Sequence, residues 1–295
     1  MEMNSLRELR FPRELIDLVV DNLCHDKMSL KHCSVLASPW MHSCYRYLFL
    51  TLIFPQYSKT GIPETLNGFD FLCRRPSFTP YVRKLHLQSL FTSQPMLAAI
   101  LNMFPALETL TIEGIIFRDL QLSETALART ALHSTQRISL DRVVIVLKDA
   151  GSNAPGHFLC PIFDSLDAVN ELRFEDATVH RDIWNYRSSM AQCTSRHATL
   201  AASSVSVEAY ELAPVLEDIR SGVNPSLLQS LRLTNICIFT TLSYLDGFLS
   251  AVPCLENIDL GFNMIRPNPH TCPCPLFHTP DSIAHDFYCS DRLAS

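Results

Sequence analysis

The sequence predicts an α/β protein, in which a short three-helix module is followed by a solenoid of repeated strand and helix units. Two observations lead to this fold. Three short amphipathic helical patterns occupy residues 11–50. An apolar pattern typical of a buried strand then recurs seven times between residues 82 and 263, with helical patterns between copies. Such repeats bury their apolar faces against one another, so their strands stack in parallel along the concave side and their helices along the convex side.

The first predicted helix begins at Pro12. Proline suits the first helical position because its missing N–H has no partner there in any case. Leu15 and Ile16 follow, and Val19 lies four residues after Leu15 and three after Ile16. This spacing predicts an apolar stripe along one side of the helix. Three helices in about forty residues bury little surface by themselves, so a partner or an adjoining domain is expected.

The second predicted helix has Ser29 as its N-cap, and the third has Ser38 as N-cap with Pro39 in the first helical position. Together the three helices resemble an F-box, most closely that of fungal F-box proteins with leucine-rich repeats. The resemblance covers residues 11–50. The residues that carry it are Phe11-Pro12-x-Glu14-Leu15, Leu30-Lys31-x-Cys33-Ser34-Val35-Leu36 and Trp40.

In that family the helices dock on a Skp-type adaptor, which links them to a cullin–RING ubiquitin ligase. The resemblance therefore implies these two partners and a set of adaptor-binding positions. Those positions are Phe11, Pro12, Leu15, Ile16, Val19, Leu30, Val35, Leu36 and Trp40. The alternative for residues 11–50 is an ordinary helical cap on a repeat array.

Residues 1–10 are expected to be an N-terminal tail, and residues 51–80 a connector and N-terminal cap that opens with a strand over 51–54. Residues 81–265 form the predicted solenoid. Its strands follow the leucine-rich pattern apolar-x-x-apolar-x-apolar. The central apolar positions are Leu85, Leu110, Ile138, Leu172, Val205, Leu231 and Ile258. Successive positions are 25, 28, 34, 33, 26 and 27 residues apart. Helices are expected over 96–104, 210–220 and 242–251.

Strand side chains alternate, so the polar residues between the apolar positions are predicted to form a surface that recognises another protein. The outward positions are Lys84, His86, Gln88, Thr109, Thr111, Glu113, Ser139, Asp141, Glu171, Arg173, Glu175, Ser206, Ser230, Arg232, Thr234, Asn257 and Asp259. Among them, ten are the predicted substrate-binding residues. These are Lys84, His86, Thr109, Thr111, Glu171, Arg173, Arg232, Thr234, Asn257 and Asp259.

The composition argues against nucleotide and nucleic-acid binding. Only 8 of the 295 residues are glycine, and the glycine-spaced segment 151–156 lacks the lysine and hydroxyl residue of a phosphate-binding loop. Residues 61–295 hold 17 basic and 24 acidic side chains, so no basic surface for nucleic acid is predicted. That acidic excess would instead suit a regulator of a basic partner.

No apolar run is long enough to span a bilayer, and the charged first ten residues do not resemble a signal peptide. The 11 cysteines are therefore expected to be reduced thiols in the cytoplasm or nucleus. Residues 266–295 contain five prolines and are expected to be poorly ordered. Their cysteines lack the paired spacing of a structural zinc module, so neither a metal nor a cofactor is predicted.

No nucleophile elbow or metalloprotease motif is present in the sequence, so the protein is not expected to be an enzyme. The predicted function is a substrate-recognition adaptor of an SCF-type ubiquitin ligase. In this function residues 11–50 bind the ligase and the repeats bind a protein substrate. The alternative is a leucine-rich-repeat scaffold that has no link to ubiquitination.

Overall fold

The computed structural model describes residues 11–54, 69, 71–88, 91–92, 94–113, 116–117, 137–146, 159–175, 199–208, 213–236 and 245–262. The chain forms two compact units. The first comprises residues 1–111 and 118–136, and the second comprises residues 112–117 and 137–295. The predicted tails, residues 1–10 and 266–295, lie outside the described residues.

The first unit begins with three helices and continues with strands and helices in alternation. Its elements are α1 (Arg13–Asn22), α2 (Lys27–Ser34), α3 (Ser38–Leu48), β1 (Thr51–Phe54), the 3₁₀ helix η1 (Pro76–Tyr81), β2 (Lys84–Gln88), β3 (Phe91–Thr92), α5 (Gln94–Asn102) and β4 (Thr109–Glu113), whose end crosses into the second unit. Strands β1, β2 and β4 are neighbours in that order. Strand β1 is parallel to β2, with Leu52 beside Leu85, so the strand expected at 51–54 is confirmed.

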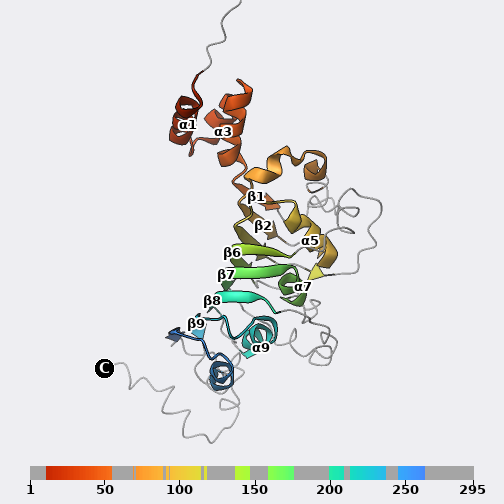
Figure 1. Cartoon of the computed structure of the whole chain (residues 1–295), viewed down its shortest axis with the longest axis vertical. Helices are drawn as coiled ribbons and strands as arrows, with labels where there is room; N and C mark the ends of the chain where they lie inside the picture. The colour runs from red at the N-terminus through yellow and green to blue at the C-terminus, as the bar shows by residue number, and fades with distance from the viewer. Residues whose placement is uncertain are drawn as a thin grey trace, which may run out of the picture. The chain divides into compact units, whose positions relative to one another are not determined.

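The second unit contains five parallel strands that are hydrogen-bonded in chain order. Its elements are β5 (Ile116–Phe117), β6 (Ile138–Val146), α7 (Leu159–Asp164), β7 (Leu166–Glu175), β8 (Ala201–Glu208), α9 (Ala213–Gly222), β9 (Ser230–Ile236) and β10 (Asn257–Phe262). Helices α7 and α9 lie on the same side of these strands (Figure 1). The α/β class with parallel strands is thus confirmed.

The repeat pattern places its central apolar residues in register across the sheet. Leu172 lies beside Val205, Val205 beside Leu231, and Leu231 beside Ile258. Leu172, Val205 and Leu231 are fully buried, as are Leu85 and Leu110 in the first unit. In the second unit, stacked apolar residues of this kind form the core that the pattern predicted.

One strand was predicted in the wrong register. Leu172 of β7 lies beside Val143 of β6, not beside Ile138. Val143 and Ile145 are buried, whereas Ile138 is half-exposed. The repeat is therefore centred on Val143, and the neighbouring spacings become 33 and 29 residues instead of 28 and 34.

This correction can be tested by truncation. Val143→Ala should lower the free energy of unfolding by about 2 kcal/mol, because it removes two buried methyl groups and leaves a small cavity. Ile138→Ala should cost less, since that side chain is half-exposed. Urea unfolding of both variants measures the difference. A larger loss of unfolding free energy for Ile138→Ala than for Val143→Ala would instead support the register predicted from the sequence, which is centred on Ile138.

The helices between the strands begin and end within a few residues of the predicted bounds. Helix α5 covers residues 94–102 and α9 covers 213–222, while residues 245–250 are also helical. Helix α9 ends at Gly222, the residue expected to stop it. Helix α7 was not predicted. It is only six residues long and contains Pro161, so its sequence shows no helical period of apolar residues.

Candidate functional site

The three-helix module has its own small core. Ile16 and Val20 of α1 pack with Leu30 of α2 and Cys44 of α3, and all four are buried. Pro12 is the N-cap of α1, and its carbonyl accepts hydrogen bonds from the N–H groups of Leu15 and Ile16. Burial raises the pKa of the Cys44 thiol, which keeps that core cysteine protonated and unreactive.

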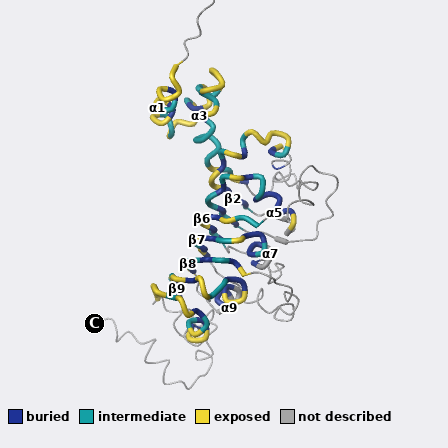
Figure 2. Tube along the Cα trace, viewed as in Figure 1, coloured by how far each residue is buried: buried dark blue, intermediate teal, exposed yellow. Residues whose placement is uncertain are grey.

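One side of α1 is apolar and exposed. Exposed residues of α1 are yellow in Figure 2. Leu15, Leu18 and Val19 are 49%, 58% and 43% exposed, and Phe11 lies one turn before them. We call Phe11, Leu15, Leu18 and Val19 the α1 stripe. The rings of Phe11 and Trp40 form a T-shaped contact, with ring centroids 6.2 Å apart. A stripe of large apolar side chains in water is unfavourable unless a partner covers it.

Further exposed apolar residues lie on α2 and in the turn after it. Val35 and Leu36 are 81% and 67% exposed, and Met28 is 60% exposed. Val35 is the C-cap of α2, so it sits where the backbone leaves the helix. The turn between α2 and α3 therefore presents two adjacent aliphatic side chains to solvent.

Two of the residues predicted to bind an adaptor belong to the module's core. Ile16 is 2% exposed and Leu30 is fully buried, so neither side chain can reach a partner. The other predicted positions remain accessible: Phe11, Pro12, Leu15, Val19, Val35 and Leu36 are exposed and Trp40 is half-buried. Leu18 and Met28 were missed. Leu18 could have been found from its spacing of three residues after Leu15.

The N-cap of α2 is Asp26, three residues before the predicted Ser29. Its carboxylate accepts hydrogen bonds from the N–H groups of Met28 and Ser29 and from the Ser29 hydroxyl, the last at 2.6 Å. These bonds, above all the one from the Ser29 hydroxyl, hold the pKa of Asp26 below its ordinary value of 3.8. Helix α3 likewise begins one residue earlier than predicted, with Ala37 as N-cap and Ser38 and Pro39 in its first turn.

The lowered pKa of Asp26 predicts a pH-dependent contribution to stability. A carboxyl group whose pKa is lowered by folding stabilises the fold above its unfolded pKa, and the contribution disappears as the pH falls through the folded pKa. Asp26→Ala should therefore lower the melting temperature at neutral pH, and its difference from the wild type should shrink in acid. Calorimetry over an acidic pH series measures this. A difference that stays constant below the folded pKa would contradict it.

The side of the module that bears Arg46 is polar. The Arg46 guanidinium pairs with Asp21 and lies 3.7 Å from Asp17, and the buried Ser43 hydroxyl donates to Asp17 at 2.6 Å. The hydroxyl of Tyr47 donates to Asp21 at 2.7 Å, and this bond raises the pKa of Tyr47. These ion pairs are partly exposed and add little stability, but they distinguish a solvated side of the module from its apolar stripe.

Aromatic rings join α3 to η1. Phe78 stacks on Phe49 and forms a T-shaped contact with Tyr45, with centroid distances of 4.7 Å and 5.2 Å. His42 Nδ1 lies 2.6 Å from the hydroxyl oxygen of Tyr81. Packed rings hold a fixed geometry. The contacts therefore fix α3 against η1, the element that precedes strand β2.

The second candidate surface is the outer strand face, formed in the second unit by side chains of β6–β10 that point away from the core. Glu171, Arg173 and Arg232 belong to it, and Arg173 and Arg232 both lie beside Ser206 of β8. Arg142 pairs with Glu171, and the Arg232 Nε lies 3.1 Å from Asp259 Oδ2. Cross-strand ion pairs thus lie on this face.

None of the ten predicted substrate-binding residues is buried. Lys84, Arg173, Arg232, Asn257 and Asp259 are exposed. The other five are half-exposed, namely His86, Thr109, Thr111, Glu171 and Thr234. On β6, however, the corrected register places Arg142 and Val144 beside Val143 on this face, instead of Ser139 and Asp141.

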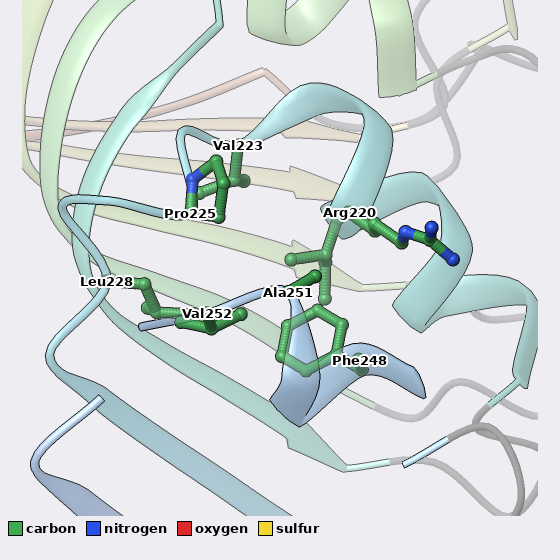
Figure 3. Close-up of a pocket in the computed structure, with 8 residues that line it drawn as sticks. Arg220, Val223, Pro225, Leu228, Phe248, Ala251 and Val252 are labelled. Atoms are coloured by element: carbon green, nitrogen blue, oxygen red, sulfur yellow. The ribbon is translucent and has the colours of Figure 1, made fainter. Parts of the chain in front are cut away.

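A small pocket lies between α9 and the helical residues 245–250 (Figure 3). It is lined mainly by apolar groups, including Val223, Leu228 and Phe248, with Arg220 beside it. Its volume is about 30 Å³, whereas small-molecule sites usually enclose roughly 300–1,000 Å³. The pocket is therefore a packing gap between two repeats.

Within the described ranges, no group of His, Cys, Asp and Glu side chains is arranged to hold a metal ion. The cysteines and histidines of residues 266–295 lie outside those ranges. Nor does any helix described by the structure have the length and apolar character needed to cross a membrane. No protein-family model matches the chain, and no curated protein matches it either.

Proposed function

We propose that this protein is a substrate-recognition adaptor of an SCF-type ubiquitin ligase. In this proposal residues 11–50 are an F-box that binds a Skp-type adaptor and, through it, a cullin–RING ligase. The parallel strands belong to an irregular leucine-rich-repeat solenoid whose outer strand face binds a protein substrate. The proposal rests on the sequence resemblance together with the exposed α1 stripe.

The α1 stripe is the observation that supports this function best. A three-helix module with a buried core of its own does not need Leu15, Leu18 and Val19 for internal packing, and each is more than two-fifths exposed. Apolar side chains in an i, i+3, i+4 arrangement are the usual means by which one helix occupies an apolar groove of another protein. An adaptor with an apolar groove is a partner that such a helix could bind.

The proposed mechanism is proximity. A substrate held on the repeats would be kept near a ubiquitin-charged conjugating enzyme bound elsewhere in the ligase, which raises its effective concentration. The aromatic contacts between α3 and η1 suit this role. A rigid connection between the helices and the repeats keeps the effective concentration of the substrate higher than a flexible connection would. The protein itself would need no reactive group.

Affinity purification of the full chain, followed by mass spectrometry, tests the proposal. Recovery of a Skp-type adaptor together with a cullin is the expected result. Recovery of other proteins without either component, from cells that contain both, would favour the repeat scaffold with no link to ubiquitination.

A further inference from the structure

Strand β10 continues the apolar columns of the sheet, but its inward side chains are not covered. In β9 the corresponding residues Leu231, Leu233 and Ile236 are completely buried. In β10 Ile258, Leu260 and Phe262 are 48%, 36% and 41% exposed. Strand β10 is the last strand of the sheet in the part of the chain that the structure describes. The core therefore ends there in three exposed apolar side chains.

The backbone of β10 also offers an edge for strand pairing. The N–H of Asn257 donates to the carbonyl of Gln229, so Asn257 directs its backbone groups toward β9. Backbone groups alternate along a strand, and those of Ile258, Leu260 and Phe262 therefore point to the open edge. Edge strands that must stay unpaired usually carry charged side chains, above all lysine, or a proline or a bulge. The charged side chain of β10, Asp259, is paired with Arg232 of β9. Strand β10 has neither lysine nor proline. The bulge next to it belongs to β9, where Asn235 has a φ of 62°.

We propose that β10 pairs with β10 of a second copy of this chain, antiparallel, about a two-fold axis at Leu260. In this register Leu260 lies opposite Leu260 of the second copy and Ile258 lies opposite Phe262. The two-fold axis repeats the second pair, so there are three hydrogen-bonded pairs and about six backbone hydrogen bonds across the dimer. The inward side chains of both copies lie on the same side of the joined sheet. Ile258, Leu260 and Phe262 of each copy therefore cover those of the other.

The charges of β10 favour this register. Asp259 falls opposite Gly261 of the second copy, where no side chain competes for space; around the Cβ position of Gly261 the nearest atoms are those of Thr234, at 3.4 Å and beyond. A two-fold axis one residue earlier would place Asp259 opposite Asp259, and opposed like charges destabilise a strand pair. Asp259 meanwhile keeps its partner Arg232 within its own chain.

Sedimentation equilibrium of the full chain tests the dimer. A dimer with a dissociation constant in the micromolar range is expected for a short strand interface. Leu260→Asp should raise that constant by about 100-fold or more, because it places two unpaired carboxylates in an apolar contact. Leu227→Asp is the matched control, since Leu227 is 47% exposed and lies off the edge, and it should leave the dimer intact.

A cysteine variant fixes the register without adding charge. In a Cys254→Ser background, Leu260→Cys should form an intermolecular disulfide with oxidised glutathione, because paired Cα atoms lie about 5.5 Å apart. Ile258→Cys faces Phe262 and should not cross-link. A chain that stays monomeric at every concentration would overturn the proposal and leave residues 263–295 to cover Ile258. A dimer that survives Leu260→Asp, or cross-links equally through both cysteines, would overturn it as well.

Discussion

Replacing Leu15 and Val19 together with aspartate should lower the affinity for a Skp-type adaptor by about 100-fold or more. Both side chains are exposed on α1, so the change leaves the module's core of Ile16, Val20, Leu30 and Cys44 intact. In the bound state the two carboxylates would lie in a dry apolar groove without partners. Titration of purified adaptor by calorimetry measures the loss.

Two controls make this result specific. Circular dichroism and the melting temperature should show that the double variant is folded, and Leu227→Asp should bind the adaptor normally. Ile16→Ala should behave differently from both. It should weaken binding only to the extent that it destabilises the module, because Ile16 lies in the core. Undiminished binding by a folded Leu15→Asp, Val19→Asp variant would remove the α1 stripe from the proposed interface.

The strands could be predicted from the sequence because a parallel strand in a repeat must bury every second residue. Leu85, Leu110, Leu172 and Leu231 were placed correctly for that reason. The register of strand β6 was wrong because two overlapping matches to the pattern run through this strand, one through Ile138 and Leu140 and one through Val143 and Ile145. Only the pairing with β7 distinguishes them.

The helical module was harder to predict at the level of single residues. An amphipathic pattern predicts an apolar stripe on a helix, but not which edge of the stripe packs against neighbouring helices and which edge stays in water. That is why Ile16 was grouped with Leu15 and Val19 although it belongs to the core. Leu30 was grouped with exposed positions for the same reason, since its exposure depends on how α2 crosses α1 and α3.

The stability of the repeats should depend on single buried leucines. Leu231→Ala is expected to lower the free energy of unfolding by roughly 2–5 kcal/mol, and Leu110→Ala by a similar amount. Leu231 lies between Val205 and Ile258 in the central column and is completely buried. Its truncation leaves a cavity whose walls are backbone-paired strands, which limits how far the site can collapse. Urea unfolding followed by circular dichroism measures the loss.

The neighbouring side chain provides the matched control. Arg232 is exposed on the outer strand face, and its pair with Asp259 is exposed on both sides, so Arg232→Ala should change stability by less than about 1 kcal/mol. The contrast between adjacent residues tests the alternation itself, because a strand shifted by one residue would exchange their effects. If Arg232→Ala proved as damaging as Leu231→Ala, the outer strand face would have to be part of a packed interface, such as one with another protein already bound.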